Sequence, residues 1–272
     1  MTDFVLRRLA GMGDVLMVAC AAKALRHIYP DCQVGIETMA QYVPLLELCP
    51  WVSWEVAPDA LRVDLIEAQH GMANCHQIDS YLRYIGVKAP SKYQKEWKTL
   101  DLNFERLPKW PRTICIHPYA NDRNRMYPEW PAVSRLLQDA GFEVVMIGPE
   151  TGYLEAIQII DRCLVFASTD SGPIQMAGAT ETPIVGLYSV VEGRHRLPYR
   201  NPSTALQPAC PFFPCYREML QRWNDYGVEP IKNGKPVAQV VGDWCAYPNY
   251  PCMTELPPSA VAAEILKYAN PS

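Results

Sequence analysis

Apolar residues in the first third of the chain occur in short runs and in longer stretches with a period near 3.6. Residues 4–9 are apolar except for Arg7 and Arg8, and residues 14–29 carry apolar side chains at 15, 16, 18, 19, 22, 25 and 28. The run predicts a buried strand, and the periodic stretch predicts an amphipathic helix. The same criteria predict further strands at 33–38 and 51–56, and helices at 40–48 and 74–85.

A polar stretch with prolines, residues 103–112, interrupts this alternation and predicts a linker. The alternation then restarts, with strands predicted at 113–117, 142–147, 164–167 and 184–188 and helices at 128–140, 152–160, 173–179 and 259–268. Alternating strands and helices favour parallel sheets with right-handed crossovers. We therefore expect an α/β protein of two doubly wound, Rossmann-like domains that face a cleft. They span residues 1–110 and 111–272, and the second includes a segment rich in cysteine and proline at 198–258.

Composition narrows the class of protein. The chain has 272 residues, of which 49% are hydrophobic and 20% charged, and its net charge of −4 offers no basic surplus for strong binding to nucleic acids. The sequence has no run of 18 apolar residues, so it predicts no transmembrane segment. The charged residues Asp3, Arg7 and Arg8 interrupt the stretch that a signal peptide needs. We expect a soluble, cytoplasmic protein.

A glycine turn follows the first predicted strand. Gly11 and Gly13 permit a tight turn, and Asp14 follows at the start of the predicted helix, where free N–H groups can hold an anion or a hydroxyl. A dinucleotide fingerprint is the rival interpretation, with Glu37 on the ribose, but Leu16 stands where the third glycine belongs. A third interpretation makes Asp14 only a helix cap.

Two later loops carry side chains suited to a phosphate or a ribose. Residues 168–175 lie between a predicted strand and a short helix, at the strand end where open α/β sheets bind ligands. The alternative is a well-capped helix without a ligand. The loop 119–130 carries Arg123 and Arg125, whose guanidinium groups suit phosphate, although a solvated surface loop explains Arg123 equally well. The cluster Arg194–Arg196 with Arg200 has less weight, since charged surface loops are common.

Four of the ten cysteines fall in the segment rich in proline. Their spacing is C-x4-C, then 29 residues, then C-x6-C, which is looser than the usual zinc knuckle. They are candidates for a structural zinc or iron site, and the alternatives are disulfides, disfavoured in cytoplasm, or unlinked thiols. These residues are Cys210, Cys215, Cys245 and Cys252.

Several stretches together carry a resemblance to a known family. They are RLAGMGDVLMVACAAKALRHIYP, IHPYANDRNRMYPEW, GFEVVMIGPE, STDSGPIQMAGATETPIVGLY and CMTELPPSAVAAEI. In this order they resemble glycosyltransferase family 9, the lipopolysaccharide heptosyltransferases. The resemblance implies a glycosyltransferase B-type fold, with an acceptor-binding N-terminal domain and a C-terminal domain for a nucleotide-activated sugar. It also implies inversion at the anomeric carbon.

The resemblance assigns roles to residues. Asp14 matches the catalytic aspartate of the family, and Arg125 stands in place of a lysine that contacts the donor phosphate. Glu150 matches an acidic residue that binds the donor ribose. Some members of the family also hold a metal through cysteines near the C-terminus. The sequence departs from the family at Gln175, usually His, and at Tyr127, usually Trp, and its N-terminal domain is shorter. The residues expected to bind the donor are Gly13, Arg125, Glu150, Thr169, Asp170, Ser171, Gly172 and Gln175.

These expectations combine into one function. We expect an inverting glycosyltransferase that uses Asp14 as general base and no organic cofactor, and that moves a heptose-like or other sugar from a nucleotide-sugar to a hydroxyl. The acceptor is a glycan, a lipid-linked molecule or a protein. The alternatives are a non-catalytic module that binds nucleotide-sugars or carbohydrates and an NAD-dependent oxidoreductase.

Overall fold

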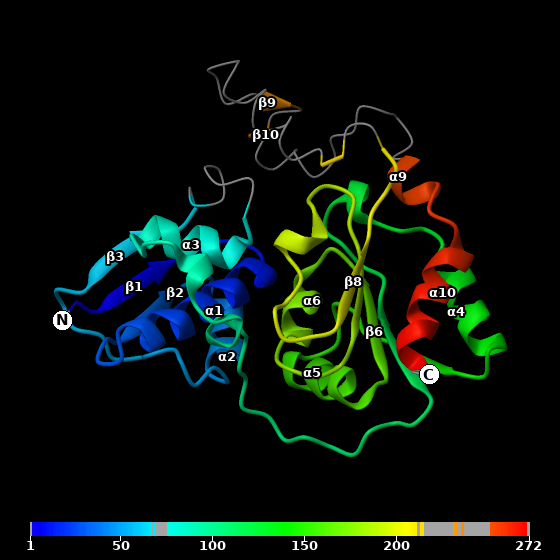
Figure 1. Cartoon of the computed structure of the whole chain (residues 1–272), viewed down its shortest axis with the longest axis horizontal. Helices are drawn as coiled ribbons and strands as arrows, with labels where there is room; N and C mark the ends of the chain where they lie inside the picture. The colour runs from blue at the N-terminus through cyan, green and yellow to red at the C-terminus, as the bar shows by residue number, and fades with distance from the viewer. Residues whose placement is uncertain are drawn as a thin grey trace.

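The chain folds into two parallel β-sheets with helices packed against them. In the computed structural model they form a blue-to-cyan half and a green-to-red half that lie side by side (Figure 1). The residues that the structure describes are 2–66, 68, 75–210, 213–214, 231–232, 235–236 and 251–270.

The first half contains a sheet with the strand order β2-β1-β3. Its strands, all parallel, are β1 (Phe4–Arg7), β2 (Val34–Glu37) and β3 (Leu61–Asp64). Helix α3 ends at Gly86, whose φ of 101° is a left-handed conformation that glycine adopts without strain. The helical elements of this half are α1 (Met12–Ile28), η1 (Ala40–Tyr42), α2 (Val43–Leu46), α3 (Gln77–Ile85), η3 (Pro90–Lys92) and η4 (Lys95–Lys98).

The second half contains a parallel sheet with the order β5-β4-β6-β7-β8. Because β4 lies between β5 and β6, the order of the strands reverses there, and such a switch point leaves a crevice at the carboxyl ends of the strands. The strands are β4 (Thr113–His117), β5 (Glu143–Met146), β6 (Val165–Thr169), β7 (Ile184–Leu187) and β8 (Ser203–Leu206). The helical elements are η5 (Arg123–Arg125), α4 (Trp130–Asp139), α5 (Tyr153–Arg162), α6 (Gly172–Ala177), η6 (Gly193–His195), α9 (Pro251–Thr254) and α10 (Pro258–Ala269). A short antiparallel pair joins β9 (Ile231–Lys232) and β10 (Lys235–Pro236).

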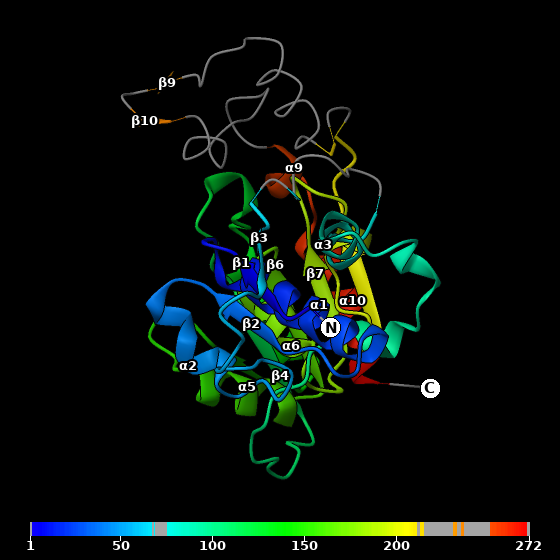
Figure 2. The same ribbon diagram turned by 90° about the vertical axis from the view of Figure 1, so that its left-hand side faces the viewer.

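Helices cover both faces of the second sheet. On one face, Ile114 and Val185 pack with residues of α4 and α10, which lie side by side at the edge of the molecule (Figure 1). On the other face, Cys115 and Phe166 pack with α5 and α6. This second apolar cluster continues through α1 into the first sheet, so the two halves share one core. Helices α1 and α6 lie between the two sheets (Figure 1) and pack against one another. In Figure 2 the first half faces the viewer, and α1 overlaps α6 in that view.

The α/β class and the parallel pairing predicted from the sequence are confirmed. Residues 103–110 lie in neither a helix nor a strand, and the linker at 103–112 stays a prediction, as does the division into two domains. The strand predicted at 51–56 is wrong. That segment runs beside β2, where Ser53 N donates to Val34 O at 2.8 Å, but it forms no ladder. The third strand is instead β3, a largely exposed edge strand, and β8 was not predicted at all.

Every helix in the described residues is too short or too polar to cross a membrane.

Candidate active site

A cavity of about 610 Å³ lies between the two halves. Its lining includes segments that follow strands at their carboxyl ends, among them residues 11–14 after β1, residues 119–122 and 124–125 after β4, and residues 170–173 after β6. Residues after β5 and β7 line it as well. The volume lies in the range of sites that hold small molecules. Parallel strands bring the predicted loops together here, as expected for a switch point in an α/β sheet.

Two glycines bring the helices of the two halves into contact below the cavity. A Cβ on Gly13 would lie 3.3 Å from Gly172 Cα, and a Cβ on Gly172 would lie 3.2 Å from Gly13 N. Both distances are tighter than ordinary van der Waals contact, so the absence of side chains allows α1 and α6 to start against each other. Gly13 and Gly172 therefore lie at the floor of the cavity.

Asp14 lies in the first turn of α1 and lines the cavity. The N-cap of this helix is Gly11, so Asp14 does not act as the cap. Its Oδ2 is 3.4 Å from Nη2 of Arg8, and its Oδ1 is 3.4 Å from Nη1 of Arg196. With 21% of its side chain exposed, the carboxylate is both anchored by cations and open to the cavity.

Tyr81 adds a third contact to this carboxylate. Its hydroxyl donates to Asp14 Oδ1 at 3.2 Å from a fully buried position on α3. Burial raises the pKa of Tyr81 far above its usual value, and the neighbouring Asp14 charge adds to the effect. The phenol therefore stays protonated and acts as a permanent donor to Asp14.

Arg125 and Asp170 face each other across the loops that follow β4 and β6. Arg125 Nη1 donates to Asp170 O at 3.1 Å and lies 3.8 Å from Asp170 Oδ2, while its Nη2 binds the Asp122 carboxylate. Asp170 is fixed in turn, because its N donates to Leu187 O at 2.9 Å. The guanidinium is 27% exposed and lines the cavity, so it can also reach a ligand there.

His117 ends β4 and supports the loop after β6. Its Nδ1 lies 3.1 Å from Ser171 Oγ and 3.3 Å from Ser168 Oγ. Burial lowers the pKa of His117 to about 4, against the opposing charge of Glu150, so the ring is neutral near pH 7. Ser171 and Gln175 both line the cavity.

Two predicted donor residues do not line the cavity. Thr169 is buried, and its Oγ1 donates to Tyr119 O at 3.0 Å, so it positions the loop after β4. Glu150 is exposed and its carboxylate folds over Gly148, beside residues of the cavity wall. The rival ribose ligand Glu37 lies away from the cavity, where its carboxylate pairs with Arg7 at 3.3 Å and Arg62 at 3.4 Å.

The cysteine site falls partly outside the described residues. Cys210 and Cys252 pack against the same apolar cluster, whereas Cys215 and Cys245 lie in segments that the structure does not describe. In the described part of the chain, no group of three or more His, Cys, Asp or Glu side chains is arranged to hold a metal ion. The four-cysteine site stays a prediction.

The solved structures with a similar fold include the following three, all at low sequence identity. A glycosyltransferase family 9 protein from Veillonella parvula DSM 2008 matches with a TM-score of 0.58 and 12% identity, over 88% of this chain and 95% of its own. The iron-containing dodecameric glycosyltransferase TibC from enterotoxigenic E. coli H10407 matches with a TM-score of 0.70 and 13% identity, over 99% and 76%. The E. coli heptosyltransferase WaaC with ADP matches with a TM-score of 0.57 and 10% identity, over 84% and 100%.

The resemblance to glycosyltransferase family 9 extends to the fold. No family model matches the chain, and no curated protein matches its sequence. The fold is therefore similar to those of these three structures, although the sequence identity is only 10–13%.

The sequence did not predict the three residues that contact Asp14. Arg8 lies in the strand predicted from the sequence and Tyr81 in a predicted helix, and neither pattern indicates a functional role for them. Arg196 stood in a basic cluster that resembled a surface loop, but only 13% of its side chain is exposed. Each meets Asp14 only through the tertiary fold.

Proposed function

We propose that the chain is an inverting glycosyltransferase that moves a sugar from a nucleotide-sugar donor to an acceptor hydroxyl. The observation that carries this proposal is the convergence of Asp14, Arg125 and Asp170 on one cavity between two parallel sheets. The similarity to family 9 glycosyltransferase structures supports it. We further propose a B-type arrangement of two domains, residues 1–110 on the acceptor side and residues 111–272 on the donor side.

In the proposed reaction, Asp14 is the general base. An acceptor hydroxyl attacks the anomeric carbon from the face opposite the leaving group, and its proton passes to the Asp14 carboxylate as the new glycosidic bond forms. The bond from the anomeric carbon to the diphosphate breaks with its electron pair, which leaves on the nucleoside diphosphate. This displacement inverts the anomeric centre. The contacts from Arg8, Arg196 and Tyr81 keep Asp14 oriented for that role.

Arg125 provides positive charge for the leaving diphosphate. A guanidinium binds phosphate oxygens through two hydrogen bonds, and charge placed in advance stabilises a leaving group as its charge develops. Asp170, Ser171, Gly172, Gly13 and Gln175 form the remainder of the proposed donor site. In this proposal Thr169 acts by holding Tyr119, and Glu150 reaches the donor ribose from the rim of the cavity.

We propose an ADP-activated heptose or related sugar as the donor. Similar structures are described as complexes with ADP and with ADP-D-beta-D-heptose, which supports this choice of nucleotide. The acceptor is a hydroxyl of a glycan, a lipid-linked molecule or a protein. Cys20, Cys49 and Cys115 are thiols rather than disulfides, which suits the cytoplasm, where we place the reaction.

The four cysteines Cys210, Cys215, Cys245 and Cys252 are proposed to hold a structural zinc or iron ion. Thiolates bind both metals, and TibC, one of the similar structures, is described as iron-containing. Such a site would stabilise a segment that is rich in proline and lacks apolar periodicity. It has no part in the proposed transfer.

The experiment that tests this function measures release of nucleoside diphosphate from ADP-, GDP- and UDP-sugars, with simple glycosides and lipid-linked sugars as acceptors. We expect transfer from an ADP-sugar, and Asp14→Asn should slow turnover ~10²-fold or more while donor affinity stays within a few-fold. The exposed Asp31 provides the control Asp31→Asn, which should behave as the wild type. Turnover near the wild-type rate in Asp14→Asn would remove Asp14 as the base. Donor binding without any transfer would favour the non-catalytic module.

A further inference from the structure

Asp14 receives cations from both halves of the molecule. Arg8 belongs to the same half and lies 3.4 Å from Oδ2, with 3% of its side chain exposed. Arg196 belongs to the other half, 182 positions away, and lies 3.4 Å from Oδ1. Oδ2 is thus held from the first half, and Oδ1 is held from both halves, by Tyr81 and by Arg196.

The backbone of Arg196 is fixed by the helix that borders the donor cavity. Gln175 Nε2 on α6 donates to Arg196 O, and Arg196 N donates to Gly193 O at 2.9 Å. The next residue is held by the first half, because His76 Nε2 lies 3.0 Å from Leu197 O. Arg196 therefore stands between α6 and α3 with little freedom to move.

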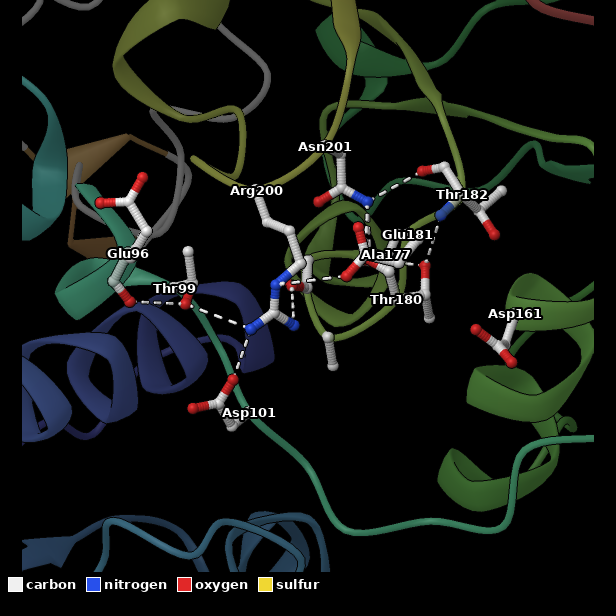
Figure 3. A network of polar contacts seen from close by, with 12 residues as sticks. Glu96, Thr99, Asp101, Asp161, Ala177, Thr180, Glu181, Thr182, Arg200 and Asn201 are labelled. Atoms are coloured by element: carbon white, nitrogen blue, oxygen red, sulfur yellow. Dashed lines mark hydrogen bonds and ion pairs between the residues drawn. The ribbon is translucent and has the colours of Figure 1, made fainter.

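The segment 196–201 continues along the interface and binds the first half at two more points. Tyr199 Oη donates to Asp79 Oδ2 at 3.2 Å. Arg200 binds the Asp101 carboxylate, at the start of the linker (Figure 3). At its far end, Asn201 Nδ2 donates to three carbonyls of the second half, those of Ala177, Thr180 and Thr182, so the segment is anchored on both sides.

We propose that Arg196 is a positioning residue for Asp14, supplied across the interface by the segment 196–201. This inference rests on the proposed function. A carboxylate held at both oxygens cannot turn about its Cβ–Cγ bond, and a misplaced base loses much of its rate advantage. Because Arg196 comes from the other half, its contact with Oδ1 forms only when the two halves are packed together, and it adds to the contacts that Arg8 and Tyr81 make from the first half.

The alternative role for Arg196 is direct contact with the donor diphosphate, since it lines the same cavity. The two roles predict different kinetics. A positioning residue affects kcat and leaves donor affinity nearly unchanged, whereas a phosphate ligand affects affinity. A residue that acts through Asp14 also loses its effect once Asp14 is gone, which a double-mutant cycle detects.

The test compares Arg196→Ala, Arg196→Lys and the control Arg194→Ala in the full chain, using transfer from an ADP-sugar and calorimetry with ADP. Arg194 is 72% exposed and its guanidinium pairs with Glu192 at 3.0 Å, away from Asp14, so its variant should match the wild type. We expect Arg196→Ala to lower kcat about tenfold with the ADP dissociation constant within about twofold, and Arg196→Lys to recover most of the rate. In an Asp14→Asn background, Arg196→Ala should change kcat less than about twofold.

Each contrary outcome has a distinct meaning. An equal loss of kcat in both backgrounds, or weaker ADP binding with kcat intact, overturns the positioning role. An active wild type with an unaffected Arg196→Ala variant overturns this inference alone. If the wild type transfers no sugar, the proposed function fails and the inference fails with it. Arg196→Lys retains the charge, so it keeps the comparison valid if the alanine variant unfolds.

Discussion

Replacing Arg200 with alanine removes a connection between the second half and the start of the linker. The guanidinium binds the Asp101 carboxylate, donates to Thr99 Oγ1 at 3.2 Å and donates to Gly178 O at 3.3 Å (Figure 3). Its side chain is 20% exposed and that of Asp101 is 28% exposed. Alanine therefore removes three hydrogen bonds, one of them to a charged group.

The expected loss of stability follows from what remains. A hydrogen bond to a charged group contributes roughly 1.5–3 kcal/mol, and partial exposure screens the pair toward the low end. Asp101 keeps Lys23 Nζ and Trp51 Nε1, each at 2.7 Å, so no buried charge is left without a partner. We therefore expect Arg200→Ala to lower the free energy of unfolding by about 2 kcal/mol, which lowers Tm by roughly 4–8 °C for a chain of this size.

Urea unfolding followed by circular dichroism measures this difference, with Arg194→Ala as a matched control. Both changes delete one arginine from the same region, but the Arg194 side chain is 72% exposed, so its loss should cost less than about 0.5 kcal/mol. If the two variants unfold at the same urea concentration, solvent screens the Arg200 contacts completely and the reasoning fails. A loss above about 4 kcal/mol would also contradict it, since that value marks an unpaired buried charge.

Four further predictions follow. Burial raises the pKa of the Asp101 carboxyl, but hydrogen bonds from neighbouring cations outweigh this effect and hold the pKa below its usual value. The ionised carboxylate therefore stabilises the fold at pH values above its pKa in the unfolded chain, and this stabilisation is lost as the pH falls through its pKa in the folded chain. The destabilisation of Asp101→Asn at neutral pH, measured by urea unfolding, should therefore shrink below about pH 4. Arg125→Ala should weaken nucleotide-sugar binding by ~1.5–3 kcal/mol in calorimetry, and unchanged affinity would place the donor elsewhere. Gly172→Ala should cost about 1–3 kcal/mol of stability, because its Cβ would lie 2.6 Å from Met12 Cε and 3.2 Å from Gly13 N, and an unchanged Tm would refute these contacts. Chelation should lower Tm without abolishing donor binding, and less than about a tenth of an equivalent of zinc plus iron in active protein would exclude a metal at Cys210, Cys215, Cys245 and Cys252.

The sequence predicted those elements whose own residues determine them. The helix after the first glycine turn and the strands of the second sheet carry strong local patterns, and they form where predicted. The segment 51–56 has an equally apolar pattern but forms no ladder, while the polar and exposed residues of β3 do pair with β1. The choice between these two segments depends on which one reaches the edge of β1, and local pattern holds no information about that.

The residues of the candidate site also fall into those that the sequence predicted and those that it did not. Asp14, Arg125 and Asp170 each lie in the segment that follows the carboxyl end of a parallel strand, so the topology brings them to one end of the sheets. Arg196 and Tyr81 reach Asp14 from positions that are distant in sequence, and their roles depend on how the two halves pack. Such contacts follow no regular spacing along the chain, so the sequence alone does not predict them.

The contact between Gly13 and Gly172 has a consequence for how the cavity can change. An added Cβ on Gly13 would lie 3.3 Å from the Gly172 backbone, so no change of rotamer there can make room for a methyl group. An added Cβ on Gly172 would first meet the Met12 side chain, with Cε 2.6 Å away, so a change of the Met12 rotamer can relieve part of that clash. A variant that accommodates a bulkier sugar or a different nucleotide base should therefore acquire that space in the loop 119–125, where side chains form the wall, and keep Gly13.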